Sequence, residues 1–174
     1  RTNLALLRRV RADNPGALIV WKPHPDVEAG LRPGAVQVAD LKGLADVTAD
    51  AAPAAALIDM VDEVWTITST LGFEALIRGK PVTTLGAPFY AGWGLTSDLG
   101  PVPPRRTARP GIAGLIHAAL IAYPRYMDPV SGLPCPVEVA LDRLAEPGAT
   151  TPGPALRALS KLQGALAGHA WIWR

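Results

Sequence analysis

The segment Lys22-Pro23-His24-Pro25 carries two side chains that can act on a phosphate. The imidazole of His24 can bind a phosphate oxygen or assist it as a leaving group, and the Lys22 ammonium adds positive charge. The prolines on both sides of His24 restrict its backbone, so little freedom is lost on binding. A loop histidine satisfied by the backbone is the alternative. A pattern of four residues does not distinguish a phosphate-binding histidine from a structural one.

A second polar segment, Ser69-Thr70-Leu71-Gly72-Phe73-Glu74, stands where a strand gives way to a helix. Backbone N–H groups and the positive end of a helix dipole favour an anion at such a start. Ser69 or Thr70 can equally be an ordinary N-cap, with Glu74 completing a feature close to a capping box. The two roles are compatible. The segment is not a Walker loop, because it lacks a Lys before the Ser/Thr pair.

Glycines and aromatic residues alternate over residues 86–96, GAPFYAGWGLT. Gly92 and Gly94 permit a close approach of backbone to a ligand, and Tyr90 or Trp93 can stack on a base or a sugar ring. We therefore predict a substrate loop here. A packed surface loop is the alternative.

Helical and strand patterns place these segments. Buried strands are predicted over 17–21, 64–68 and 81–85, and the order strand, polar turn, helix, strand around residues 64–85 is a βαβ unit. The fold class is therefore α/β with an open parallel sheet, in which ligands bind beyond the carboxyl ends of the strands. The two prolines after residue 22 predict a loop there, without helix. Helices are predicted over residues 4–10, 53–62, 73–78, 111–123, 137–144 and 155–166.

Composition limits the class of protein. The 174 residues are 49% apolar and carry a formal charge of +2, which disfavours a nucleic-acid-binding surface. A single cysteine, Cys135, excludes an internal disulfide, and the scattered histidines give no metal-ligand spacing. No apolar run is long enough to cross a bilayer. We predict one domain over 1–146, a linker and C-terminal helix over 147–174, and, because the chain opens at Arg1, a piece of a longer cytoplasmic protein. Arg105, Arg106 and Arg109 are expected to form a solvated charged loop.

Three strings together resemble one known family. KPHPDV at 22–27, WTITSTLGFEALIRG at 65–79 and GAPFYAGWGLT at 86–96 resemble the bacterial capsule polysaccharide biosynthesis family of KpsC/LipB type, and residues 123–129 resemble a further segment. The similarity covers roughly residues 1–146, and the two longer strings are the specific ones.

That resemblance implies a β-Kdo transferase, which takes Kdo from CMP-Kdo and adds it to a lipid-linked saccharide acceptor. It implies a GT-B-like fold, with this chain as the Rossmann-like half that binds the nucleotide, and it requires neither a metal nor a cofactor. It assigns His24 to stabilising the leaving phosphate. The positions that match the family around the CMP phosphate are His24-Pro25 and Ser69-Thr70. With them we predict a nucleotide site that also includes Lys22, Gly72 and Glu74, in which Glu74 or a carboxylate near Asp50 holds the ribose hydroxyls. The predicted substrate loop is Tyr90, Gly92, Trp93 and Gly94.

The resemblance also implies what the chain lacks. Upstream of His24 the only carboxylate is Asp13, which reads as a helix terminator, so the main catalytic carboxylates are expected outside this chain. The fragment alone is then expected to bind donor without turning it over. Expected partners are the missing N-terminal half and the capsule export machinery, with at most peripheral contact with the inner face of the inner membrane.

Two other functions stay open. A GT-B transferase or epimerase acting on a UDP-sugar would hold a diphosphate at Ser69 and Thr70, so selectivity among CMP, UMP and UDP separates it from the first reading. A non-catalytic docking module of the export machinery would bind no nucleotide, and would use a partner surface that includes Trp171 and Trp173.

Overall fold

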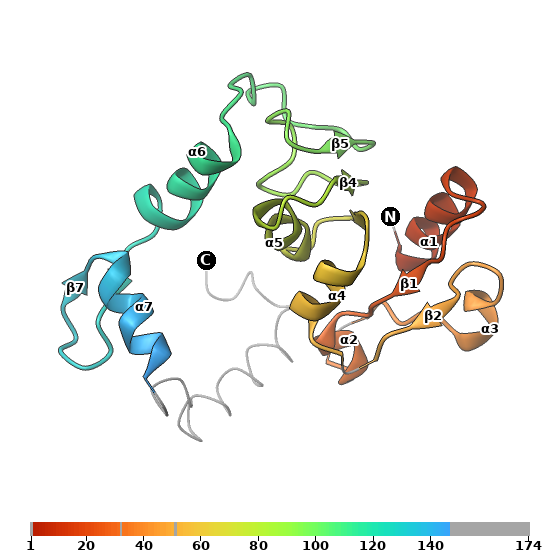
Figure 1. Cartoon of the computed structure of the whole chain (residues 1–174), viewed down its shortest axis with the longest axis horizontal. Helices are drawn as coiled ribbons and strands as arrows, with labels where there is room; N and C mark the ends of the chain where they lie inside the picture. Colours follow the sequence, from red (N-terminus) through yellow and green to blue (C-terminus); the bar gives the residue numbers. More distant parts are fainter. Residues whose placement is uncertain (1, 32, 51, 147–174) are drawn as a thin grey trace, which may run out of the picture. The chain divides into compact units, whose positions relative to one another are not determined.

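The computed structural model of the chain describes residues 2–31, 33–50 and 52–146 (Figure 1). These residues form two compact units, which divide after Ile116. The first unit is α/β, and its elements in chain order are α1 (Asn3–Asp13), β1 (Val20–Trp21), α2 (Pro25–Glu28), α3 (Val38–Leu41), β2 (Val47–Thr48), α4 (Ala54–Met60), β3 (Val64–Thr66), α5 (Leu71–Ile77), β4 (Val82–Thr84), β5 (Ser97–Asp98) and α6 (Ile112–Ile116). The predicted helix over 155–166 and the linker before it lie outside the described residues.

The first helix is defined by its caps. The Thr2 hydroxyl accepts a hydrogen bond from the Ala5 N–H at 3.2 Å, and Asn14 ends α1 with its own N–H bonded to the Val10 carbonyl. Leu6 and Leu7 are buried, so this helix packs by one face, as the spacing of its leucines predicts.

Strands β1 and β2 form a parallel pair, with Val20 opposite Val47. Asp46 fixes the approach to this pair, because its Oδ2 accepts the Ile19 N–H at 2.7 Å and pairs with Arg11 at 2.6 Å. The Ile19 N–H and the Arg11 guanidinium both lower the pKa of the Asp46 carboxyl.

The prediction of a loop without helix after residue 22 is wrong. Pro25 begins the short helix α2, and His24 is its N-cap. Proline is tolerated at the first helical position, because the N–H that it lacks would have had no partner inside the helix.

Strands β3, β4 and β5 form a three-stranded parallel sheet in that order. The first two were predicted from their β-branched residues, and they are shorter than predicted. The third has two residues, which is too short for a periodic signal. The parallel strands therefore lie in two small sheets, where a single open sheet was expected.

Helix α5 connects β3 to β4 and contains three of the buried residues: Gly72, Phe73 and Ala75. It ends in a Schellman motif at Gly79, whose φ of +72° is unfavourable for other residues. The Lys80 N–H bonds to the Ala75 carbonyl and the Gly79 N–H to the Leu76 carbonyl, both at 3.0 Å. The glycine that closes this helix was predicted.

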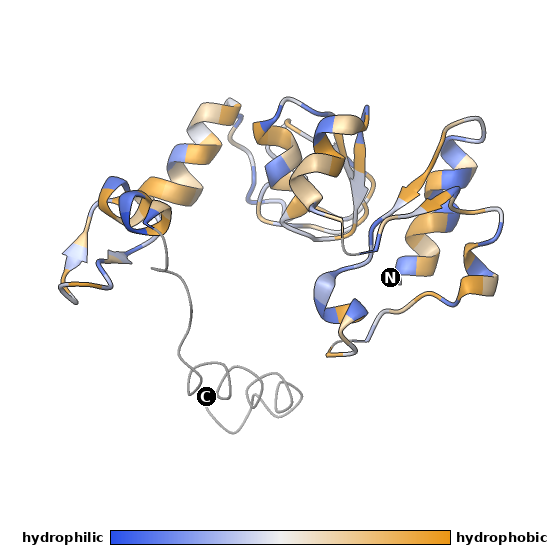
Figure 2. Ribbon diagram, turned by 60° about the horizontal axis from the view of Figure 1, so that its bottom comes forward, coloured by the Kyte–Doolittle hydropathy of each residue, from blue (hydrophilic) through white to orange (hydrophobic). Residues whose placement is uncertain are grey.

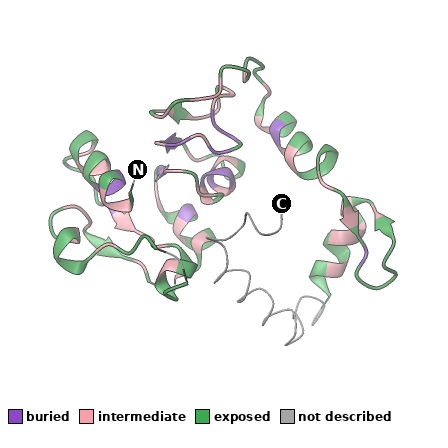
Figure 3. Ribbon diagram, turned by 180° about the vertical axis from the view of Figure 1, so that it is seen from behind, coloured by how far each residue is buried: buried purple, intermediate pink, exposed green. Residues whose placement is uncertain are grey.

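The core lies around this βαβ unit. Buried positions, purple in Figure 3, are most frequent in β4 and α5. All three residues of β4 are buried, as expected for a central parallel strand. Tyr90, Ile58 and Thr84 are the largest fully buried side chains among the described residues.

The second unit contains the π-helical segment η1 (His117–Ala122), the antiparallel pair β6 (Tyr126–Met127) and β7 (Pro134–Cys135), and helix α7 (Val137–Ala145). The helices over 111–123 and 137–144 were predicted from sequence, whereas the hairpin was not. Figure 2 shows both hydrophobic and hydrophilic residues on α7, and Leu141 and Leu144 are exposed.

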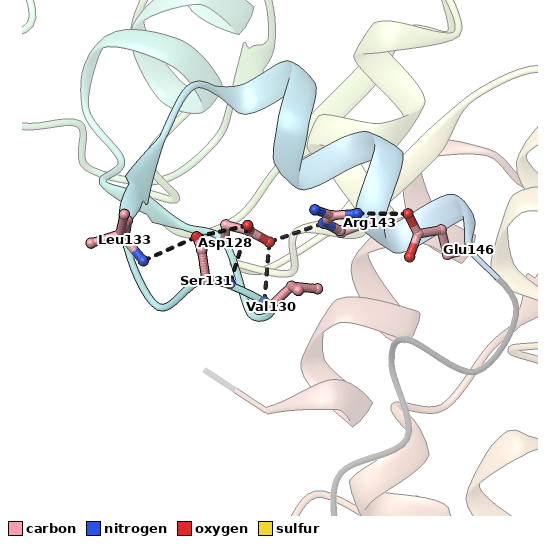
Figure 4. A network of polar contacts seen from close by, with 6 residues as sticks. All are labelled: Asp128, Val130, Ser131, Leu133, Arg143 and Glu146. Carbon is pink, nitrogen blue, oxygen red and sulfur yellow. Dashed lines mark hydrogen bonds and ion pairs between the residues drawn. The ribbon is translucent and has the colours of Figure 1, made fainter.

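One ion pair joins the hairpin of this unit to α7 (Figure 4). The Asp128 carboxylate accepts the Val130 N–H at 3.1 Å and the Ser131 hydroxyl at 2.8 Å, and it pairs with Arg143 at 3.0 Å. The Arg143 guanidinium, followed by the Ser131 hydroxyl and the Val130 N–H, holds the pKa of Asp128 well below its usual range.

Within the part of the chain that the structure describes, no helix is both long and apolar enough to span a membrane.

Candidate functional site

The start of α5 is organised by two hydroxyl groups. The Ser69 N–H donates to Thr66 Oγ1 at 3.2 Å, and Ser69 Oγ accepts the Leu71 N–H at 3.2 Å. Ser69 therefore acts as a local cap, while its hydroxyl hydrogen remains for a further acceptor. Thr70, the residue just before α5, makes no side-chain capping bond. Both readings of this segment are compatible with that geometry.

Gly72 is required by a neighbouring side chain. A Cβ at this position would lie 2.3 Å from the Tyr90 hydroxyl oxygen, so only glycine lets the ring approach α5. The Tyr90 hydroxyl donates to the Ser69 carbonyl. This contact ties the loop over residues 86–96 directly to the Ser-Thr segment.

Tyr90 does not have the role that the sequence suggests. Its side chain is 0% exposed and packs against Phe73 and Phe89, so the ring is not available to stack on a ligand. Burial raises the pKa of the Tyr90 phenol far above its usual range, so the hydroxyl stays protonated and remains a donor.

A row of polar residues crosses the sheet at the carboxyl ends of its strands. Thr66 of β3 is in register with Thr84 of β4, which is in register with Asp98 of β5. Thr84 Oγ1 donates to Asp98 Oδ1 at 3.1 Å. Thr66 holds Ser69, and Asp98 Oδ2 accepts the Gly92 N–H at 2.9 Å. At the carboxyl ends of the strands, this row of residues therefore holds both the Ser69–Glu74 segment and the 86–96 loop.

The loop over 86–96 is also held from a second direction. Arg106 donates to the carbonyls of Pro88, at 2.6 Å, and Ala91, at 2.8 Å, and its guanidinium carbon lies 5.6 Å from the centre of the Trp93 ring. Arg109 donates to the Ala108 carbonyl at 2.9 Å. The expectation that these arginines form a solvated loop is therefore wrong for Arg106, which is partly buried because it satisfies backbone carbonyls.

Trp93 and Phe89 are the aromatic residues of this loop that are not buried. The Trp93 ring is partly exposed, and its Nε1–H donates to the Phe89 carbonyl at 2.7 Å. The Phe89 side chain is 43% exposed. Gly92 and Gly94 have φ values of +83° and +82°, and a Cβ at Gly92 would lie 2.0 Å from a Val102 methyl. These glycines are therefore required by the fold of the loop, whatever it binds.

The Lys22–Pro25 segment follows β1, in the other small sheet. His24 Nδ1 accepts the Asp26 N–H at 3.1 Å, so the neutral ring carries its proton at Nε2, and the side chain is 44% exposed. The Lys22 ammonium pairs with Glu28 at 2.9 Å and is largely covered. The described contacts therefore form two groups. One joins Ser69 and Gly72 to the 86–96 loop, and the other joins Lys22 and His24 to α2.

Glu74 lies in the first turn of α5 and is partly exposed, and its carbonyl accepts the Arg78 N–H. Asp13, the carboxylate upstream of His24, pairs with Arg9 at 2.7 Å on the surface of α1. Among the described residues, no group of three or more His, Cys, Asp or Glu side chains could hold a metal ion.

Sequence reasoning missed Thr66, Thr84, Asp98 and the role of Arg106. The threonines lie inside the strings TITST and VTT, where β-branched residues are expected in any strand. Their alignment follows from the strand register, which a single sequence does not give. The sequence signal for Asp98 is Thr96-Ser97-Asp98, at the end of the glycine-rich loop.

Comparison with known proteins gives consistent matches. The model of the family described as capsule polysaccharide biosynthesis protein matches residues 1–126. The capsule polysaccharide modification protein LipA of Neisseria meningitidis serogroup B is 51% identical over 127 residues, which are 73% of this chain and 18% of LipA. The lipopolysaccharide-processing protein LpsZ of Rhizobium meliloti is 44% identical over 144 residues, 83% of this chain and 32% of LpsZ. The chain thus spans less than a third of each of these relatives.

Solved structures of KpsC from Thermosulfurimonas dismutans also match. Its β-Kdo 2,7 transferase has a TM-score of 0.71 and 43% identity, over 81% of this chain and 44% of that one. Its β-Kdo 2,4 transferase has a TM-score of 0.69 and 33% identity, over 80% and 43%. The resemblance to the KpsC/LipB type is confirmed, and the chain belongs to the capsule polysaccharide biosynthesis family.

Proposed function

We propose that this chain is the donor-binding part of a β-Kdo transferase of capsule assembly, and that it binds the CMP moiety of CMP-Kdo. The observation that carries the proposal is the match to the β-Kdo 2,7 transferase, at 43% identity over 81% of the chain. The motifs that we assign to nucleotide binding, at 22–25 and 69–74, lie within the residues matched by the family model.

The local geometry offers suitable donors for a phosphate. The Ser69 hydroxyl uses its oxygen to cap α5 and keeps its hydrogen, and Thr70 makes no side-chain capping bond. The His24 ring holds Nδ1 against the Asp26 N–H, which leaves Nε2 as the nitrogen that donates. Three donors of this kind suit the oxygens of a phosphodiester.

In the proposed reaction the bond between the Kdo anomeric carbon and the phosphate oxygen breaks, and CMP leaves with an additional negative charge. The oxygen of an acceptor hydroxyl becomes bonded to that carbon, and its proton passes to a base in the rest of the longer protein. Hydrogen bonds aimed at the phosphate oxygen stabilise the charge as it develops. His24 would supply one such bond through Nε2, and Ser69 and Thr70 would supply others through their hydroxyls. Glu74, one turn into α5, would hold ribose hydroxyls.

The role of Lys22 is constrained by its partner. Its ammonium is already paired with Glu28 at 2.9 Å, so in the proposed complex it contributes positive charge near the phosphate while it stays paired. The same pair fixes α2, and therefore His24, relative to the end of β1. Lys22 thus positions His24 as well as attracting the anion.

Turnover should need residues that the chain does not have. The chain covers 44% of the β-Kdo 2,7 transferase chain, and Asp13 is paired with Arg9. We therefore assign the catalytic carboxylates and the lipid-linked acceptor site to the rest of a longer protein. Alone, the chain is expected to bind donor and to leave it intact.

Calorimetric titration with CMP, UMP and UDP tests the nucleotide assignment. The proposal predicts that CMP binds and that UMP and UDP bind at least tenfold more weakly. Equal or tighter binding of UDP would instead support the UDP-sugar alternative. If a folded sample binds none of the three, the donor-binding role is wrong for this chain.

A further inference from the structure

The backbone of the loop over 86–96 is held by the carboxylate of Asp98. Asp98 Oδ2 accepts the Gly92 N–H at 2.9 Å, and Oδ1 accepts the hydroxyls of Thr84, at 3.1 Å, and Thr96, at 2.7 Å. Three donors on one carboxylate fix its rotamer as well as its position.

Asp98 is in turn anchored in the core. It lies at the end of β5, in register with Thr84, whose side chain is fully buried. Through its bonds to Thr84 and to the Gly92 N–H, the carboxylate therefore fixes the backbone of Gly92 relative to the central strand β4. Trp93 is the next residue along the chain.

The loop needs such a restraint. Gly92 and Gly94 both have positive φ, and glycine loses more conformational freedom on ordering than any other residue. Arg106 restrains the segment through the carbonyls of Pro88 and Ala91, and Asp98 restrains it through the N–H of Gly92. Arg106 thus binds carbonyl groups of this turn, and Asp98 binds one of its N–H groups.

The position of this loop indicates what Trp93 would contact. Tyr90, in the middle of the loop, bonds to the Ser69 carbonyl, so this part of the loop lies beside the segment to which we assign the donor phosphate. In a nucleotide sugar the sugar ring is bonded to that phosphate. Trp93 follows Tyr90 by three residues in this loop, and it is the ring that we assign to the donor sugar, whose C–H faces stack on aromatic rings.

We propose that Asp98 is a positioning residue, which holds Gly92 so that Trp93 presents a preformed stacking surface to the donor sugar. Asp98 acts through the Gly92 N–H and does not itself touch the sugar. The sugar contact rests on the proposed donor-binding function, whereas the ordering of the loop does not.

Two variants separate the hydrogen bonds of Asp98 from its charge. Asp98→Ala removes all three acceptor bonds. Asp98→Asn keeps the shape, because the amide oxygen can accept the Gly92 N–H while the amide nitrogen donates to the threonine hydroxyls. Asp142→Ala, at an exposed position of α7, is the matched control for loss of a carboxylate.

Hydrogen exchange of the ligand-free protein tests the ordering of the loop. Asp98→Ala should speed exchange at residues 86–96 by at least about tenfold, with residues 64–77 unchanged, while Asp98→Asn and Asp142→Ala stay close to wild type. Unchanged exchange in the loop of Asp98→Ala overturns the proposal. So does equally fast exchange in Asp98→Asn, or faster exchange throughout the first unit, which would mark a general structural role.

Titration with CMP and with CMP-Kdo tests the sugar contact. The gain in affinity from CMP to CMP-Kdo should fall roughly three- to tenfold in both Asp98→Ala and Trp93→Ala, with CMP affinity retained. An unchanged ratio in either variant refutes the sugar contact. If wild type binds neither compound, the proposed function fails and takes the sugar contact with it, while the exchange result still decides whether Asp98 orders the loop.

Discussion

At the scale of single residues, Ser69 and Thr70 differ in whether the side chain caps α5. Ser69 Oγ caps α5 through the Leu71 N–H, whereas Thr70 makes no such bond although it directly precedes the helix. A substitution at Thr70 should therefore affect binding with little effect on the fold. A substitution at Ser69 should affect both.

The first prediction concerns this pair. Thr70→Val should weaken CMP binding by about tenfold or more, the loss expected for one hydrogen bond to a charged group, and leave the unfolding midpoint within about 1 °C of wild type. Ser69→Ala should weaken binding similarly and also destabilise the fold by about 1 kcal/mol through loss of the cap. Calorimetry and urea denaturation measure the two effects. Wild-type CMP affinity in Thr70→Val would exclude its hydroxyl from the site.

The second prediction concerns Gly72. Gly72→Ala should lower the free energy of unfolding by about 1–3 kcal/mol, because the new Cβ would meet the buried Tyr90 hydroxyl and force the ring to move. Gly16→Ala is the control, since a Cβ at Gly16 meets no atom within 4 Å. Chemical denaturation of both variants gives the difference. If the two are equally stable, the close packing of Tyr90 on α5 is not present in solution.

At the scale of elements, much of the arrangement followed from sequence. Leucine spacing located α1, β-branched runs located β3 and β4, and Gly79 marked the end of α5, because each depends on local periodicity or on one backbone conformation. The sequence does not predict helix α2, because a proline ends a helix at an interior position but is tolerated at the first one, where Pro25 stands. The pairing of β1 with β2, the two-residue β5 and the Thr66–Thr84–Asp98 row depend on contacts distant in sequence.

The candidate site divides in the same way. The two segments that we assign to the donor phosphate, and the loop of glycines and aromatic residues, could be recognised in the sequence from their residue types after predicted strands. That Tyr90 is buried, and that Arg106 holds carbonyls, could not be read from the sequence, because a string does not show which side of a loop faces the core.

The third prediction is a pH dependence in the second unit. The pKa of Asp128 is lowered in the folded state, so its interactions stabilise the hairpin and α7 above the carboxyl's unfolded pKa of about 3.9. That stabilisation is lost as the pH falls below about 4 toward the lowered value. Asp128→Asn, which cannot form the ion pair with Arg143, should be less stable at neutral pH and show a flatter pH profile. Hydrogen exchange of residues 126–145 between pH 7 and pH 3, corrected for intrinsic rates, measures this.

If protection of the hairpin from hydrogen exchange has the same pH dependence in wild type and in Asp128→Asn, this prediction is wrong. Glu138→Gln, on the same helix, is the control for the loss of a carboxylate. Its profile should follow that of wild type.

At the scale of the whole molecule, the proposed function requires that the chain bind a CMP-sugar donor through His24 and the start of α5. The family model, the two relatives and the two KpsC structures each match 72% or more of this chain. The chain itself spans less than half of either KpsC structure. Donor binding without turnover is the behaviour expected of such a part.

The most direct test is thermal unfolding with saturating CMP, on wild type, His24→Ala and His117→Ala. His117 is an exposed histidine of η1, so its variant controls for the loss of an imidazole. At about 100 times the dissociation constant, CMP should add roughly 2.7 kcal/mol of stability, a shift on the order of 5 °C for a domain of this size. We predict this shift in wild type and His117→Ala, and its loss in His24→Ala. An equal shift in all three proteins, or none in folded wild type, would contradict the assignment of His24 to the donor phosphate.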